Sequence, residues 1–208
     1  GWLPLEVRAG QDGQALRLVL NSDKPPVLQG DNGFSQKHPG GGGSYYYSQP
    51  FLRAEGELVM DGRRVAVRGD AWLDREWSTS ALGPGQAGWD WFALQFADGR
   101  DLMYYRLRRQ DGSADPFSAG SLSHPDGVIE ALDPGRLRLT AERWWQADDG
   151  TRVSSDLVVD AVPEEIPRQP LERLEVTQRC KVAAAELDHE AVLMQHRHHR
   201  CLCCTTLF

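Results

Sequence analysis

The sequence lacks an excess of basic residues, a long apolar run and a recognisable leader. Its 208 residues include 23 Lys and Arg against 30 Asp and Glu, which gives a formal net charge of −7. Surfaces that bind nucleic acids usually carry a basic patch, so no nucleic-acid partner is expected. The absence of any run of 18 or more apolar residues argues against a transmembrane helix. Residues 1–4 show no sign of the basic and apolar regions of a signal peptide.

Cysteine and aromatic residues are missing from opposite ends of the chain. All four cysteines lie at or after Cys180, and Phe208 is the only Phe, Tyr or Trp that follows Trp145. A segment so poor in aromatic residues cannot build the same kind of core as the rest, so residues 163–208 are expected to form a non-homologous or poorly ordered tail. The His and Cys residues between 195 and 204 lack the second, separated ligand pair of a structural zinc site, so no metal or other cofactor is expected.

What the chain does contain is a two-residue alternation of apolar and polar side chains, interrupted at short intervals by turn residues. This pattern predicts an all-β, antiparallel fold. Asp61-Gly62 and Asp98-Gly99 each separate two such runs and are interpreted as two-residue hairpin turns. The expected strands are Ala15–Leu20, Ser44–Phe51, Leu52–Val59, Arg64–Leu73, Trp89–Phe96, Asp101–Arg108, Gly127–Leu132, Arg136–Trp145 and Ser155–Val162.

A two-residue turn at Asp98-Gly99 fixes the pairing of the strands on either side. It places Trp91 opposite Arg106 and Trp89 opposite Arg108. One face would be apolar and face a core, with Phe92, Leu94, Phe96, Met103, Tyr105 and Leu107. The opposite face would carry Trp89, Trp91, Gln95, Tyr104 and Arg106. That second face has two interpretations, either an outer surface on which Arg side chains cover Trp rings or the mixed lining of a barrel interior.

Four of the seven tryptophans and several acids gather in about twenty residues. They occur in Ala71-Trp72-Leu73-Asp74-Arg75-Glu76-Trp77 and in Gly88-Trp89-Asp90-Trp91-Phe92. Each indole buries a large apolar area, roughly 150–250 Å², yet keeps an N–H that needs a partner. Acids beside aromatic residues therefore suit either a corner of the core or a ligand pocket.

Together with residues 23–35 and Ser44-Tyr45-Tyr46-Tyr47-Ser48, these segments resemble the AttH-like family. That family groups bacterial proteins described as predicted secreted hydrolases with the carotenoid 1,2-hydratases. The resemblance implies two consecutive lipocalin-like β-barrels and a periplasmic or secreted location.

Three departures from the family pattern shape the domain prediction. The upstream Glu-Trp-Trp-Tyr motif is missing, the acidic motif Asp-His-Glu-Trp reads Asp74-Arg75-Glu76-Trp77, and the pattern cannot be followed beyond Thr151. The chain is therefore expected to hold an incomplete copy of the family's fold. Residues 1–60 would be the remaining strands of the first barrel and residues 61–162 an incomplete second barrel. A homodimer is expected to supply the strands that are missing.

The function expected from the resemblance is the binding of an apolar small molecule, such as an isoprenoid, a fatty acid or a polyketide-like compound, without catalysis. The alternative is a hydro-lyase of the carotenoid 1,2-hydratase type, which adds water to an isoprenoid double bond by acid catalysis. A serine hydrolase is not supported, because the nucleophile motif Gly-x-Ser-x-Gly is absent. Arg75 would keep neighbouring acids ionised, which favours binding over proton transfer. The predicted catalytic residues are Asp74, Glu76 and Tyr105, and the predicted ligand-binding residues are Tyr46, Trp72, Arg75, Trp77, Trp89, Trp91, Gln95, Tyr104 and Arg106.

Overall fold

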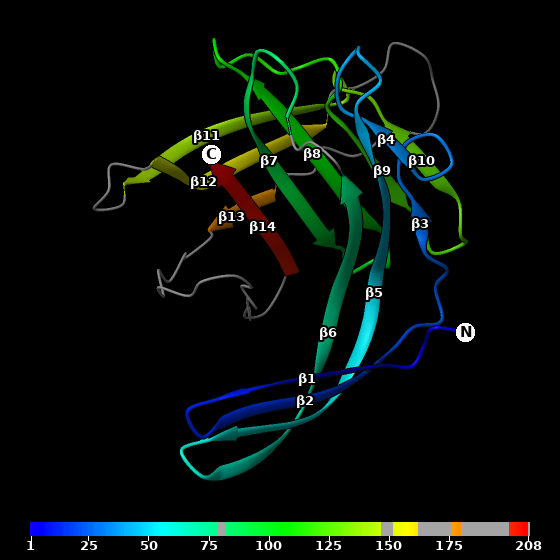
Figure 1. Cartoon of the computed structure of the whole chain (residues 1–208), viewed down its shortest axis with the longest axis vertical. Helices are drawn as coiled ribbons and strands as arrows, with labels where there is room; N and C mark the ends of the chain where they lie inside the picture. The colour runs from blue at the N-terminus through cyan, green and yellow to red at the C-terminus, as the bar shows by residue number, and fades with distance from the viewer. Residues whose placement is uncertain (79–81, 147–151, 162–175, 180–199, 208) are drawn as a thin grey trace.

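The computed structural model describes residues 1–78, 82–146, 152–161, 176–179 and 200–207. Every regular element in these ranges is a β-strand, and the strands form three antiparallel sheets (Figure 1). The predicted all-β, antiparallel class is therefore confirmed. The described ranges also hold no helix of the length and apolarity needed to span a bilayer.

The first sheet is organised around the long strand β5 (Gly43–Met60). Its other strands pair directly with β5, except for β1, which pairs with β2. Three short partners lie along one edge of β5, and β6 follows the other edge (Figure 1). Among the described strands β6 pairs only with β5, and the predicted homodimer remains a prediction. The strands are β1 (Leu5–Gln11), β2 (Gln14–Asn21), β3 (Val27–Leu28), β4 (Phe34–Gln36), β5 (Gly43–Met60) and β6 (Arg63–Ser78).

The hairpin that joins β5 to β6 has the predicted two-residue turn. Met60 pairs with Arg63, and Asp61 and Gly62 between them have φ values of 50° and 75°, as a type I′ turn requires. The two strands predicted over residues 44–59 are a single strand with a register shift between Gln49 and Leu52. Because this bulge adds one residue to β5, its side chains change faces there. The pairs between β5 and β6 join residues on both sides of the domain boundary predicted at residue 60. That boundary remains a prediction.

The second and third sheets contain the remaining strands. In the second sheet the order is β10-β9-β8-β7-β14, and in the third it is β11-β12-β13. Two of these strands, β13 and β14, lie within the predicted tail, residues 163–208. The other residues of that tail lie outside the described ranges. One of them, β14, pairs with β7 from Arg200 opposite Gln95 to Leu207 opposite Gly88 (Figure 1). The strands are β7 (Gln86–Gln95), β8 (Asp101–Arg109), β9 (Ala119–Ser123), β10 (Ile129–Leu132), β11 (Leu137–Gln146), β12 (Arg152–Ala161), β13 (Val176–Arg179) and β14 (Arg200–Leu207).

The predicted register of the β7–β8 hairpin is wrong by one residue. Phe96 N–H donates to the Arg100 carbonyl at 2.8 Å, so three residues rather than two form the loop. Only Gly99, with φ of 86°, is left-handed in this turn, whereas Asp98 accepts the Arg100 N–H on its side chain at 3.0 Å. A turn followed by one left-handed residue is the three-residue hairpin with a bulge.

The one-residue difference exchanges the two faces of β8 relative to β7. Trp91 lies opposite Tyr105 and Trp89 opposite Leu107, whereas Phe92 lies opposite Tyr104. Both faces are packed. One face contacts the first sheet in a cluster that includes Tyr46, Trp72, Trp89, Trp91, Met103, Tyr105 and Leu107. The other face packs in a second cluster with Phe92, Leu94, Leu102, Tyr104, Leu122, Leu132 and Leu137.

Candidate functional site

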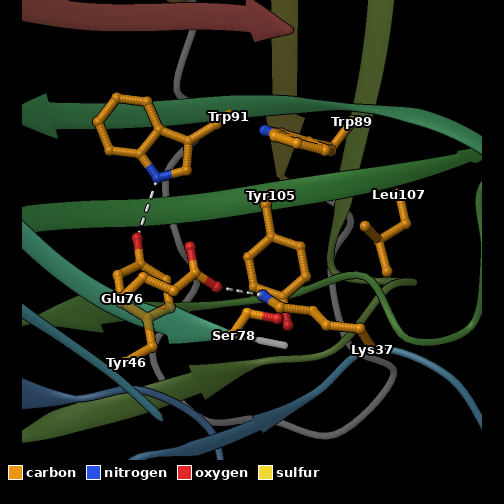
Figure 2. Close-up of a pocket in the computed structure, with 8 residues that line it drawn as sticks. All are labelled: Lys37, Tyr46, Glu76, Ser78, Trp89, Trp91, Tyr105 and Leu107. Carbon is orange, nitrogen blue, oxygen red and sulfur yellow. Dashed lines mark hydrogen bonds and ion pairs between the residues drawn. The ribbon is translucent and has the colours of Figure 1, made fainter. Parts of the chain in front are cut away.

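A cavity of about 320 Å³ opens where the first sheet packs on the second. Its walls come from β5, β6, β7 and β8 and from the residue that follows β4 (Figure 2). Aromatic and apolar side chains form most of the lining, and a small polar group lies at one end. The lining residues are Lys37, Tyr46, Glu76, Ser78, Trp89, Trp91, Tyr105 and Leu107.

Strand alternation in β5 and β6 supplies the polar end. Tyr46 pairs with Glu76 and Ser48 pairs with Asp74, so these four side chains share the face that meets the second sheet. Ser44 Oγ donates to Glu76 Oε1 at 2.5 Å and fixes the position of that carboxylate. The first sheet therefore presents two acids and a phenol in adjacent rows.

The aromatic wall comes from the second sheet. Trp91 of β7 is paired directly with Tyr105 of β8, and Trp89 is paired with Leu107. These four side chains therefore project on the same face of the second sheet. Trp91 Nε1 donates to the Tyr46 hydroxyl at 3.0 Å, which joins the two sheets at the cavity (Figure 2). This bond satisfies the indole N–H and orients the ring along the wall.

Lys37 is the one cation among the lining residues, and it is not among the residues predicted from the sequence. Its Nζ lies 3.3 Å from Glu76 Oε1 and 3.5 Å from the centroid of the Tyr105 ring (Figure 2). Burial lowers the pKa of Lys37 from its ordinary value, and the Glu76 carboxylate offsets part of that shift. Ser35 and Lys37 are both buried, on either side of the exposed Gln36, so the alternation of a strand continues to the residue after β4.

The phenols at the site are held neutral. Tyr105 shares a 2.8 Å hydrogen bond with Ser35 Oγ, and burial raises its pKa to about 12. Burial also raises the pKa of Tyr46 well above the ordinary value, with a further contribution from the nearby Asp74 carboxylate. Both hydroxyl groups are therefore proton donors or acceptors at neutral pH rather than anions.

Asp74 lies just behind the cavity lining. Its Oδ1 accepts hydrogen bonds from Ser48 Oγ at 2.6 Å and Trp72 Nε1 at 2.9 Å. Burial raises the pKa of Asp74, and these bonds, together with one from Tyr46, offset part of the increase. The Tyr46 hydroxyl, which belongs to the cavity lining, connects this carboxyl group to the cavity.

Comparison with known proteins places the chain in a family. The sequence model of the AttH-like family matches residues 2–191. The chain belongs to the AttH-like family. The match continues past Thr151, where the motifs recognised in the sequence end.

Two solved structures resemble this AttH-like chain. A crystal structure of an AttH-assigned protein from Nitrosomonas europaea has 34% sequence identity and a TM-score of 0.68, over 74% of this chain and 48% of that one. Kievitone hydratase from Nectria haematococca has 17% identity and a TM-score of 0.60, over 75% of this chain and 48% of its own, and this likeness shows the fold alone. The chain spans about half the length of both structures. No curated protein sequence matches it.

The AttH-like chain brings five of the twelve predicted residues to the lining of the cavity. Glu76, Tyr105, Tyr46, Trp89 and Trp91 line it. Asp74 and Trp72 lie behind the lining on the same face of β6. Gln95 instead donates to the carbonyls of Pro50 at 2.8 Å and Ala71 at 3.2 Å, so it ties the end of β7 to the bulge in β5.

Arg75 and Trp77 lie on the opposite face of β6 from the acids, which corrects the prediction for both. They pair with Tyr47 and Tyr45, and Trp77 is 54% exposed. The period-two geometry of a strand sends Arg75 away from its neighbours in sequence. The predicted pairing of Arg75 with the acids is therefore wrong, because its side chain lies on the other face of the strand.

Tyr104 and Arg106 are also outside the cavity, because of the register difference in the β7–β8 hairpin. Tyr104 is 1% exposed in the cluster on the far face of the second sheet. Arg106 donates twice to Asp90 Oδ2, at 2.9 Å and 2.6 Å, on that same far face. Both residues contribute to the packing of the second sheet rather than to the site.

Proposed function

We propose that this chain binds a small, mainly apolar molecule in the cavity between its first two sheets. The observation that carries the proposal is the composition of the lining, in which four aromatic rings and Leu107 surround a single polar end formed by Lys37, Glu76 and Ser78. Ligand sites are typically apolar pockets in which a few polar groups fix the orientation of the ligand. The cavity lies near the lower end of the usual range of roughly 300–1,000 Å³.

The ligand class that suits this lining is an isoprenoid, a fatty acid or a polyketide-like compound of modest size. The apolar body would lie against Trp89 and Trp91, and a polar group would meet Lys37. A periplasmic or secreted location is compatible with membership of the AttH-like family.

Tryptophan fluorescence tests this proposal, because two of the lining residues are indoles. Geraniol, decanoic acid and naringenin represent the three ligand classes, and at least one is expected to quench the emission saturably. Trp91→Phe is expected to weaken binding roughly two- to tenfold, because an aromatic contact contributes roughly 0.5–1.5 kcal/mol. Trp77→Phe, on the outer face, is the matched control and is expected to bind normally. Flat titrations with all three compounds would contradict the proposal.

A second candidate function is the acid-catalysed hydration of an isoprenoid double bond. It is favoured by Asp74, whose pKa is raised by burial and which reaches the cavity through Tyr46. The Tyr46 hydroxyl would pass a proton to one alkene carbon, the faces of Trp89 and Trp91 would stabilise the carbocation, and water would add to the other carbon. Asp74 would return the proton to Tyr46, and the added water would release one of its protons to Asp74, so that one alkene and one water molecule give one alcohol.

This second function is tested by incubating the protein with lycopene and analysing the products for an added hydroxyl group. One end of the carotene would enter the cavity and the rest would extend outside. Asp74→Asn is expected to abolish product formation by removing the proton source, roughly a 10²–10⁴-fold loss. Arg75→Ala, on the other face of the same strand, is expected to retain it. Equal activity in the Asp74→Asn variant would exclude Asp74 as the acid.

A further inference from the structure

Lysine is rare in this chain, and one of the few lysines is buried in the candidate site. The sequence contains twenty arginines but only three lysines, Lys24, Lys37 and Lys181. A cation needed only for charge could be arginine, which is always protonated, whereas a lysine amine can lose its proton and react. The side chain of Lys37 is only 11% exposed and lines the cavity.

We propose that Lys37 is a nucleophile that forms an imine with an aldehyde or ketone group of the ligand. The proposal rests on the proposed binding function and names the chemical class of the ligand, an apolar molecule that carries a carbonyl group. Two neighbours constrain Nζ, the Glu76 carboxylate at 3.3 Å and the face of the Tyr105 ring at 3.5 Å from its centroid. Figure 2 shows Nζ between these two groups at the polar end of the cavity.

The proposed step is balanced without a co-reactant. Glu76 takes a proton from the Lys37 ammonium, and the free amine attacks the carbonyl carbon to form a C–N bond. The resulting carbinolamine loses its oxygen as water, with the one proton returned by Glu76, and a protonated C=N bond remains. One carbonyl and one amine therefore give one imine and one water molecule.

The surroundings of Lys37 favour this chemistry over a permanent ion pair. Burial lowers the pKa of its amine, which increases the reactive fraction at neutral pH by about tenfold for each unit of lowering. Trp89, Trp91 and Leu107 supply apolar walls that would hold the rest of the ligand. Tyr105 is neutral and is tied to Ser35, so its ring is a fixed support rather than a competing anion.

Reductive trapping of the wild-type protein tests the proposal. Citral, a ten-carbon isoprenoid aldehyde, is incubated with the protein at pH 7, sodium cyanoborohydride is added, and peptides are mapped by mass spectrometry. The expected result is one reduced citral group on Lys37, at least about tenfold above the labelling of Lys24. Lys24 is the internal control, because its amine donates to Gly99 O at 2.7 Å and to Asp101 at 2.5 Å, and it does not line the cavity.

A tryptophan-quenching titration with geraniol distinguishes a failure of imine formation from a failure of binding. Geraniol is the alcohol corresponding to one isomer of citral and cannot form an imine. Tryptophan quenching by geraniol without any citral adduct on Lys37 would overturn the imine proposal and leave the binding function intact. Loss of the adduct in Lys37→Arg, with an unchanged circular dichroism spectrum, is the expected result for the variant. Labelling confined to Lys24, Lys181 or the amino terminus would also overturn the proposal.

Discussion

Replacement of Arg106 by alanine is expected to lower the free energy of unfolding by about 3 kcal/mol and to leave ligand binding unchanged. Arg106 donates two hydrogen bonds to Asp90, whose side chain is only 7% exposed. Removing one member of a buried ion pair leaves the other charge without adequate compensation, which costs roughly 3–5 kcal/mol. The lower end of that range applies, because Arg108 Nε remains 3.5 Å from Asp90.

Urea denaturation and the geraniol titration together check this expectation. Arg75→Ala is the matched control, since Arg75 is an exposed arginine on β6 and its removal is expected to change stability by less than about 0.5 kcal/mol. If Arg106→Ala weakened binding without lowering stability, Arg106 would belong to the site, as the sequence first predicted. The double measurement therefore also tests the register of the β7–β8 hairpin.

Phe92→Ala is expected to have the largest effect on stability, a loss of about 3–5 kcal/mol. Phe92 is 1% exposed and packs among residues from β8, β9, β10 and β11. Truncating a buried phenylalanine removes its transfer free energy and leaves a cavity that the surrounding strands fill only in part. The loss is a large fraction of the 5–15 kcal/mol by which domains are typically stable.

The same denaturation experiment measures this effect, with Val65→Ala as the control for an exposed strand residue. Val65 is 48% exposed, so its truncation is expected to cost less than about 0.5 kcal/mol. Phe92→Leu, which keeps most of the volume, is expected to fall between the two. A loss below about 1 kcal/mol for Phe92→Ala would mean that the cluster on the far face of the second sheet is not packed as described.

Much of the fold could be predicted because its signals are local. The two-residue alternation identified the β7 and β8 strands, and Asp61-Gly62 forms the expected turn because both residues adopt positive φ. The motif around Trp72 to Trp77 also led to the correct family and to the acids that lie near the cavity. Each of these inferences needed only a few neighbouring residues.

The errors came from features that local sequence leaves undecided. Asp98-Gly99 has the same letters as Asp61-Gly62, yet Asp98 uses its carboxylate to accept the Arg100 N–H and the loop gains a residue. That single residue moved Tyr104 and Arg106 to the far face. Lys37 was missed because the short strand β4 was not predicted, and its importance depends on Tyr105, which is distant in sequence.

Sequence patterns were enough to predict the all-β class, the positions of most strands in the described ranges and the family, because alternation and motifs are encoded residue by residue. The folded chain was needed to show which acids face the cavity and that Arg75 turns away from them, since those outcomes depend on strand pairing. It was also needed to show that Lys37 lies against Glu76 and Tyr105. A one-residue change in register reverses every side chain of a strand, and the packing between two sheets fixes that register.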